Sequence, residues 1–489
     1  MTVLADIQPT WWRRHWLYVF FGIVIVVKAA LLLFLGPTTF PDSGAYIDLG
    51  RSILDDPNWW KVGGWGEGYA PPRLLRPYGY PLLIAAAIRL TGDHYFYLLA
   101  SLQSLAALLP LWLIEKAARP LVPDLRLRIL LMALYAASGF LLFDLAILTD
   151  SLYATLFITV FAVIALQLQG LVRPSLPLSL ALGLAWGASI TLRDVGLLHS
   201  FLPLSGLLLA SWTAGLGSKR TLALGVGFLL PVALVAEIVI QWNLLRTGHS
   251  FFSVTGGINW LWPSVNINDR GLADAFDCGD IICQTAKSQN FGKGMEGVFA
   301  IADTLWRSLH LDPVEFGHLT LSHFLGVVRH HPWAMLGSVI GNLQFPHLAD
   351  LIFNPLSNAN QLMFLHSERL QRAFATPREM LHDIHAGAYW LALPLLAHWL
   401  MNALSLAALA ATIVLAPWRS VRRLRQNPDR QATTTLYLWL MAAGFIGSYS
   451  IVHMEMRHAM PAVPLILLVF GWTVADFCKC AFRNKVLHK

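Results

Sequence analysis

Charged residues are scarce in this sequence, at 13% of 489 residues, whereas 56% are hydrophobic. Soluble domains carry about a quarter charged residues, so a soluble chain of this length would have too little charge to cover its surface. The net charge of +7 is modest and sits in a few short loops, which argues against nucleic acid as a partner. The sequence also has no solenoid-like repeat and no low-complexity tract. These absences indicate a protein embedded in a lipid bilayer.

Long apolar segments fill much of the chain instead. A hydrocarbon core about 30 Å thick needs roughly 20 apolar helical residues. We therefore expect an all-α, polytopic transmembrane helical bundle of about ten spans and at most thirteen, with a small extracytoplasmic loop domain. The expected spans are 16–35, 94–115, 129–148, 150–169, 178–193, 196–213, 221–242, 388–416, 434–453 and 459–477.

Lys and Arg in the short loops predict the orientation, because they mark the cytoplasmic side. Arg13 and Arg14 precede the first span, and every second loop after it is basic. The loop 417–431 alone carries five arginines. We expect both termini to be cytoplasmic, in a bacterial inner membrane. The first span carries Lys28 and is too long for the apolar region of a signal peptide, so we expect it to stay uncleaved.

This topology divides the chain into three parts. Residues 1–242 form an N-terminal transmembrane catalytic module that includes an outer loop, 36–93. Residues 243–387 form an extracytoplasmic region, and 388–489 form a C-terminal transmembrane module with a cytoplasmic tail. The apolar stretch 333–353 contains several polar residues, which suits an interfacial helix. A re-entrant or membrane-spanning hairpin also fits it.

The four cysteines fall into two compartments. Cys278 and Cys283 lie in the outer region, where an oxidising environment permits a disulfide. No histidine is near them in the sequence, so we do not expect them to bind a metal. Cys478 and Cys480 follow the last span and are expected to be free cytoplasmic thiols.

Ionisable residues near the outer ends of the spans are candidate functional groups, because charge is costly within a membrane. A proton-coupled carrier would place them at the bilayer midplane instead. Any one of them could be a simple end-of-helix charge, and two, Asp144 and Glu237, could pair with a neighbouring Arg or a backbone donor. The group comprises Asp42, Asp144, Asp150, Arg193, Asp194, Glu237, Glu455, Arg457 and His458.

Five segments in matching order resemble the GT-C glycosyltransferases, although each is weak alone. Pro41–Tyr46 resembles the opening of the first outer loop, and Arg76–Leu83 resembles a basic-Pro-x-Gly-Tyr-Pro stretch. Leu148–Leu152 matches an acidic position before the fourth span, and Thr191–Arg193 resembles a Leu-Thr-Arg segment. Glu455–Pro461 resembles a late Glu-x-Arg-Tyr-x-x-Pro motif. The likeness is to the protein O-mannosyltransferase and aminoarabinose transferase type.

The sequence departs from the family pattern at two positions. Asp194 stands where proline is usual, and His458 stands where tyrosine is usual. These departures bear on which sugar is handled more than on the class of reaction.

The resemblance implies that a polyprenyl-phosphate-linked sugar enters from the outer leaflet and passes to an envelope glycan, lipid or protein. Asp42 would be the general base. Arg76, with Arg193 and Arg457, would bind the donor phosphate. Asp150 would orient the acceptor or hold a divalent cation (Mg²⁺, Mn²⁺ or Ca²⁺) together with Asp42.

The same motifs place Tyr46, Tyr80, Glu455 and His458 among the residues expected to bind substrate. The aromatic side chains of Trp260 and Trp262 could stack on a sugar ring or anchor their loop to the membrane.

Two other functions stay open at this stage. A transporter or flippase of a lipid-linked saccharide could use the same outward cavity, but it would need a polar path to the cytoplasm. A non-catalytic subunit would have lost the catalytic positions, yet Asp42 and Arg76 are present.

Overall fold

The computed structural model describes residues 10–60, 76–138, 143–289, 294–309, 311–355 and 377–487. Its regular elements are helices, and the described residues contain no strand, only an isolated bridge between Thr38 and Ala146. This confirms the predicted all-α polytopic fold. The side chains of residues 1–14 and 480–489, which carry part of the predicted orientation signal, lie outside the description, as does the thiol of Cys480.

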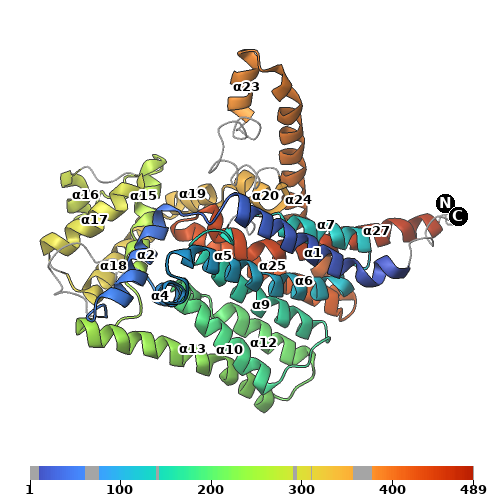
Figure 1. Ribbon diagram of the computed structural model, residues 1–489, viewed down its shortest axis with the longest axis horizontal. Coiled ribbons are helices and arrows are strands. Elements are labelled where there is room, and N and C mark those ends of the chain that lie inside the picture. Colours follow the sequence, from blue (N-terminus) through green and yellow to red (C-terminus); the bar gives the residue numbers. More distant parts are fainter. Residues whose placement is uncertain are drawn as a thin grey trace.

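A bundle of largely parallel and antiparallel helices forms the body of the molecule (Figure 1). Its helices up to residue 247 are α1 (Thr10–Phe34), α4 (Gly79–Thr91), α5 (Tyr95–Ala106), α6 (Leu108–Leu121), α7 (Leu125–Ala136), α9 (Asp150–Leu168), α10 (Leu176–Leu192), α11 (Val195–Leu198), α12 (Phe201–Thr213) and α13 (Ser218–Thr247). Those after residue 390 are α24 (Ala392–Gln426), α25 (Arg430–Val452), α26 (Met456–Ala459) and α27 (Val463–Leu487).

Eight helical segments among the described residues are long and apolar enough to cross a membrane, and α10 is a shorter apolar helix. They overlap nine of the ten expected spans. The expected span 129–148 differs, because α7 ends at Ala136 and residues 144–149 form turns, bends and the bridge to Thr38. Residues 139–142 of that span lie outside the description. The number of spans therefore stays a prediction.

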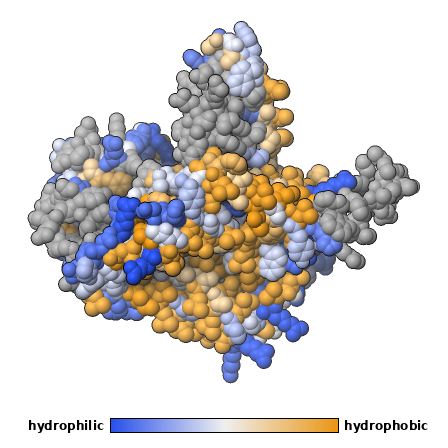
Figure 2. Space-filling view, viewed as in Figure 1, coloured by the Kyte–Doolittle hydropathy of each residue, from blue (hydrophilic) through white to orange (hydrophobic). Residues whose placement is uncertain are grey.

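The bundle keeps one large hydrophobic core, centred on α9. Fifteen of the side chains of α9 are buried, among them Phe157 and Phe161, whose ring centroids lie 4.5 Å apart. Where α10 crosses α13, Gly183 faces the backbone of Phe228, and a Cβ atom there would lie 2.3 Å from the Phe228 carbonyl oxygen. Glycine is therefore needed for this close packing. Hydrophobic side chains cover much of the bundle surface (Figure 2), as expected for a surface facing lipid tails.

One ion pair crosses this core. Lys28 on α1, only 8% exposed, pairs with the fully buried Asp144, which also accepts a hydrogen bond from Ser151. Since burial of an unpaired charge is costly, the lysine and the carboxylate each need the other. This answers the question left by the sequence: Asp144 pairs with a lysine in the first span and not with a neighbouring arginine.

A second group of helices lies at one end of the bundle, at the left of Figure 1. It contains α14 (Thr255–Asn259), α15 (Trp262–Asp269), α16 (Ile281–Gln289), α17 (Gly294–Leu309) and α18 (Pro313–His330), which enclose a hydrophobic cluster of their own. The helix α2 (Pro41–Asp55) lies between this group and the bundle.

The apolar stretch 333–353 forms two short helices, α19 (Pro332–Leu343) and α20 (Phe345–Phe353). They meet at Gln344, which adopts a left-handed conformation with φ 42°. Leu351 and Ile352 of α20 join the core of the bundle. Beyond it, α23 (Pro377–His385) and the start of α24 project away from the bundle (Figure 1).

Candidate functional site

Asp42 and Asp150 are brought to the same end of the bundle by the bridge at Thr38. The N–H of Thr38 donates to the Leu145 carbonyl at 2.9 Å, and its own carbonyl accepts from the N–H of Ile147 at 3.0 Å. These bonds hold the residues before α2 beside those that lead into α9. Asp42 in the first turn of α2 and Asp150 in the first turn of α9 then line the same cavity.

Two arginines hold the half-buried carboxylate of Asp42. Its Oδ1 accepts a hydrogen bond from Arg76 at 2.6 Å, and its Oδ2 accepts one from Arg457 at 2.6 Å. Burial alone would raise the pKa of Asp42, but the charges of Arg76 and Arg457 outweigh it and lower the pKa below its usual value. Asp42 is therefore a carboxylate at neutral pH, with a guanidinium group on each oxygen.

A close contact between α4 and α10 fixes the position of Arg76. Gly79, at the start of α4, lies against Thr191, where a Cβ atom would come within 2.6 Å of the Thr191 carbonyl oxygen. This contact brings Arg76 to the end of α10, where Arg193 follows. The Arg76 guanidinium lies 5.2 Å from the centre of the Tyr46 ring, a cation–π distance. Tyr46 thus helps to hold Arg76 toward the cavity.

The second carboxylate, Asp150, pairs with Arg193 at 2.9 Å. Asp150 is nearly fully buried, and the Arg193 guanidinium lies 5.8 Å from the centre of the Tyr153 ring. The next residue, Asp194, accepts hydrogen bonds from the Val195 N–H at 2.9 Å and from the Ser253 hydroxyl. Asp194 therefore caps α11 and ties it to the chain after α13.

The segment between α25 and α27 supplies the remaining polar groups. Arg457 pairs with Glu455 at 2.5 Å as well as with Asp42, and Nε2 of His453 lies 3.4 Å from the other Glu455 oxygen. Burial alone would raise the pKa of Glu455, but the His453 hydrogen bond and nearby positive charges, Arg457 among them, hold it well below its usual value. His458 stacks on Tyr449 with ring centroids 4.6 Å apart. These contacts orient Arg457 toward Asp42.

Two neighbouring cavities meet at Arg76. The polar cavity has a volume of about 600 Å³ and is lined by Asp42, Tyr46, Arg76, Asp150, Arg193, Asp194, Trp260, Tyr449, His453, Arg457 and His458, among others. The apolar cavity, about 320 Å³, is lined by Trp59, Leu82, Ile190, Ile238, Trp242 and Arg246, among others. Arg76, Pro77, Asp194, Phe252 and Ser253 line both. A polar chamber thus continues into an apolar groove.

Two of the expected substrate-binding residues do not line either cavity. Tyr80 is fully buried, donates to Gln103 at 2.6 Å and packs edge-on against Tyr46. Glu455 acts through Arg457. Tyr46 and His458 do line the polar cavity, as does Trp260. Among the other charged candidates, Glu237 is exposed, accepts a hydrogen bond from Gln241 and lines neither cavity.

The sequence analysis missed the walls of the apolar groove. Arg246, near the end of α13, lies 5.0 Å from the centre of the Tyr78 ring and lines the groove. The sequence held no clear signal for it, because other arginines and lysines also occur between residues 243 and 387. Trp59 and Trp242, with ring centroids 5.4 Å apart, also line the groove.

The carboxylates of the polar cavity suit arginines better than the expected divalent cation. Asp42 binds two guanidinium groups and Asp150 pairs with a third, so neither carboxylate keeps the uncompensated charge that a cation site requires. Within the described part of the chain, the side chains grouped closely enough to hold a metal are Cys278, Asp280, Cys283 and His323, outside both cavities.

No protein-family model matches the chain, and no curated protein matches it either. Among solved structures, the chain is similar to the oligosaccharyltransferase of Archaeoglobus fulgidus in its apo form, with 13% identity and a TM-score of 0.49. This match covers 98% of the chain but only 52% of the archaeal protein, so the chain spans about half the length of that protein.

Two further structures are similar at lower scores. One is the archaeal oligosaccharyltransferase AglB in complex with an inhibitory peptide and a dolichol-phosphate, with 12% identity, a TM-score of 0.44, and coverage of 98% of this chain and 52% of AglB. The other is ArnT from Cupriavidus metallidurans bound to undecaprenyl phosphate, with 15% identity, a TM-score of 0.35, and coverage of 94% and 78%. Both proteins are GT-C glycosyltransferases, the group that the sequence motifs resemble.

Proposed function

We propose that this protein is a glycosyltransferase that moves a sugar from a polyprenyl-phosphate donor to an acceptor on the outer face of the membrane. The observation that carries the proposal is the junction at Arg76 of an arginine-lined polar chamber with an apolar groove. A polyprenyl-phosphate sugar has the matching three parts: an apolar chain, an anionic phosphate and a polar sugar.

The apolar groove suits the polyprenyl chain. Leu82 on α4 and Ile238 on α13 line it, and they are 46% and 67% exposed on the outside of the bundle. A groove bordered by such side chains is accessible from the lipid, so the donor can enter sideways without leaving the membrane. Arg246 and Arg76 lie along the groove as cations for the phosphate.

Three arginines supply the electrostatic part of catalysis. When the bond from sugar to phosphate breaks, negative charge develops on the departing phosphate oxygen, and positioned cations stabilise it. Arg76, Arg193 and Arg457 all line the polar cavity, and each is held by a carboxylate. Their positions are therefore set before the donor binds, which avoids the cost of ordering flexible side chains.

Asp42 acts as the general base in this proposal, but only once the donor is bound. A base with a lowered pKa, engaged by two guanidinium groups, accepts a proton poorly. A donor phosphate that shares the Arg76 and Arg457 guanidinium groups would weaken their hold on Asp42, which raises the pKa of Asp42 and lets its oxygens accept a proton. The acceptor hydroxyl then gives its proton to Asp42 and attacks the sugar, and the polyprenyl phosphate leaves. Asp150, held by Arg193, would orient the acceptor.

The charge pattern of the loops supports a location of this chamber on the side opposite the five-arginine loop 417–431. In a bacterial inner membrane it would face the periplasm or the exterior. An acceptor arriving from that side would be an envelope glycan, lipid or protein.

Sugar transfer in proteoliposomes tests the proposal. Purified protein would receive radiolabelled polyprenyl-phosphate sugars and crude envelope acceptors, alongside Asp42→Asn and a control, Asp48→Asn, which removes an exposed carboxylate from the same helix outside the cavity lining. We expect label in the acceptor with the parent protein and the control but not with Asp42→Asn. Label that crosses the bilayer unchanged with all three proteins would refute the transferase and indicate a flippase.

A further inference from the structure

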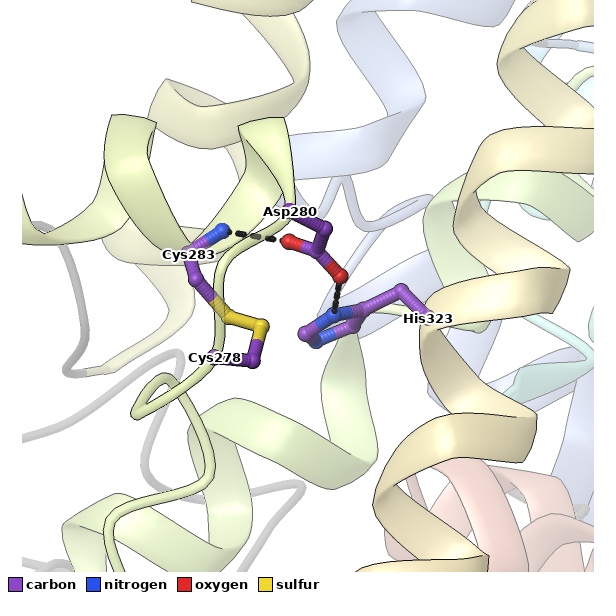
Figure 3. A group of neighbouring side chains, drawn as sticks. All are labelled: Cys278, Asp280, Cys283 and His323. Carbon is purple, nitrogen blue, oxygen red and sulfur yellow. Dashed lines mark hydrogen bonds and ion pairs between the residues drawn. A yellow bond between two sulfur atoms is a disulfide. The ribbon is translucent and has the colours of Figure 1, made fainter.

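A second cluster of reactive side chains lies in the outer helices, outside both cavities (Figure 3). Cys278 and Asp280 precede α16, Cys283 lies in its first turn, and His323 comes from α18. No histidine is near these cysteines in the sequence, but the fold brings His323 to them. His323 follows Asp280 by 43 residues. One ligand atom of each of the four residues lies within 4.8 Å of the others.

The cluster is ordered by its own hydrogen bonds. Asp280 accepts the N–H of Cys283 at 2.8 Å through one oxygen, and its other oxygen lies 2.8 Å from Nδ1 of His323. The opposite ring nitrogen of His323, Nε2, lies 2.9 Å from the hydroxyl of Ser264, which is fully buried. The His323 side chain is only 2% exposed and stacks on Phe276. Its orientation is therefore fixed on both sides of the ring.

Cys278 and Cys283 form a disulfide, with Cα atoms 5.7 Å apart. We propose that, when this disulfide is reduced, Cys278, Asp280, Cys283 and His323 bind a zinc ion in a tetrahedral site. Two thiolates, an imidazole and a carboxylate are all ligands that zinc accepts, and the four residues between the cysteines fit the spacing of zinc-binding pairs. Zinc ligand atoms lie roughly 3.3–3.8 Å apart. The two sulfur atoms, bonded here, and the His323–Asp280 pair, 2.8 Å apart, must therefore separate, while pairs nearer 4.8 Å must approach.

The hydrogen bonds of His323 orient its ring for zinc binding. Without zinc, Nδ1–H donates to the Asp280 carboxylate and Nε2 accepts from the Ser264 hydroxyl. When zinc binds Nδ1, the ring proton moves to Nε2, which donates to the Ser264 oxygen, and the lone pair of Nδ1 is given to the metal. Metal-binding histidines commonly donate their other N–H to such a partner, which fixes the tautomer and strengthens the ligand. Ser264 therefore serves as the positioning residue of the site.

The change from disulfide to zinc site balances with an external dithiol as reductant. Its thiolate attacks the exposed Cys278 sulfur, and the buried Cys283 sulfur leaves. The second thiol then resolves the mixed disulfide, so the dithiol becomes a disulfide and both cysteines become thiols. Zinc displaces the two thiol protons. The disulfide joins residues only five apart, whereas the zinc ion would join α16 to α18.

The experiment measures zinc bound by the full-length protein in detergent. Cys478→Ser and Cys480→Ser are introduced into the parent, so that the tail thiols cannot contribute. The protein is kept oxidised or is reduced with a water-soluble phosphine, which becomes a phosphine oxide. It is then loaded with Zn²⁺, separated from free metal and analysed by mass spectrometry of the elements. Co²⁺ replaces Zn²⁺ in a parallel sample to report tetrahedral thiolate coordination by its visible spectrum.

We expect about one zinc per chain after reduction and little before it. Adding Cys278→Ser with Cys283→Ser should abolish this binding, and Ser264→Ala, which keeps all four ligands, should weaken zinc affinity about 10–100-fold. The proposal is overturned if the reduced parent binds no more zinc than the variant without Cys278 and Cys283, or if its cobalt spectrum lacks the thiolate charge-transfer band. None of these readouts depends on sugar transfer.

Discussion

Within the described residues, two aspartates each bind two arginines, in different surroundings. In the first group, Asp42 binds Arg76 and Arg457 beside the polar cavity. In the other group, Asp476 on α27 binds Arg419 and Arg423 of α24. The residue types are the same, yet the Asp42 side chain is 27% exposed and that of Asp476 is 3% exposed.

The arginines of the second group pack on aromatic rings instead of facing a cavity. Arg419 lies 5.4 Å from the centre of the Phe477 ring, and Arg423 lies 5.6 Å from that of Trp472. None of these residues lines the polar cavity or the apolar groove. The comparison indicates that an Arg–Asp–Arg group joins helices where it is packed, and can bind a substrate only where a cavity adjoins it.

Asp42→Asn should have the largest effect on transfer. Loss of a general base costs about 10²–10⁴-fold in rate, whereas the thermal unfolding temperature should change little, because the arginines left behind still face a hydrated cavity. Initial rates in proteoliposomes and thermal unfolding in detergent measure the two quantities. A rate near that of the parent protein would remove Asp42 from the role of base.

Arg76→Lys should have the next largest effect, with Arg423→Lys as its matched control. Lysine keeps the charge but loses the planar, two-pronged donor geometry. Loss of one charge-assisted hydrogen bond to the phosphate corresponds to a fall of roughly 10–100-fold in kcat/KM for the donor. Arg423→Lys should leave kcat/KM unchanged. Equal losses in the two variants would show that the comparison between the groups is false.

The pH dependence of transfer tests whether the arginines beside Asp42 control its ionisation, as the comparison between the two groups implies. The pKa of Asp42 lies below its ordinary value of 3.8, so the carboxylate form is fully present above that value and is lost only as the pH falls through the lower folded-state value. Asp42 should therefore cause no fall in kcat/KM between about pH 8 and pH 5. The Arg457→Ala variant loses one positive charge beside Asp42, which raises the pKa of Asp42. The fall of kcat/KM at acid pH should therefore begin at a higher pH than in the parent protein. An unchanged pH profile would mean that Asp42 does not control this fall.

Asp476→Asn should have the smallest effect on transfer and a large one on stability. Removal of one partner from a buried ion pair costs about 3–5 kcal/mol, and less here because Arg423 is partly exposed. We expect a lower thermal unfolding temperature and an unchanged rate per folded molecule. A reduced rate at full folding would mean that this second group acts on the cavity from a distance.

Hydropathy predicted most of the bundle, because a span is a local property of about 20 residues. It was misleading at 129–148, where Leu145, Ile147 and Leu148 are apolar and buried but not helical. Leu145 and Ile147 are held in this conformation by hydrogen bonds with Thr38, more than 100 residues earlier in the chain. A window along the sequence does not contain that partner.

The candidate site was predictable as a set of residues but not as an arrangement. Motif order pointed to Asp42, Arg76 and Arg457, yet nothing in the sequence shows that both arginines bind the same carboxylate, one of them 415 residues away. Tyr80 lies in a motif too, but it is buried against Gln103. His323 could not be assigned to the cysteines, because only the packing of α16 near α18 brings it to them.

The ion pair between Lys28 and Asp144 has a consequence for how the protein is made. The first helix enters the membrane with its lysine before the aspartate, 116 residues later, has been synthesised. At about 5–20 residues per second, this delay lasts roughly 6–23 seconds. During that time the lysine must stay neutral, reach the membrane surface or be held by the insertion machinery. Correct assembly of the bundle therefore requires the first helix to stay in place without the partner of Lys28 until Asp144 has been translated.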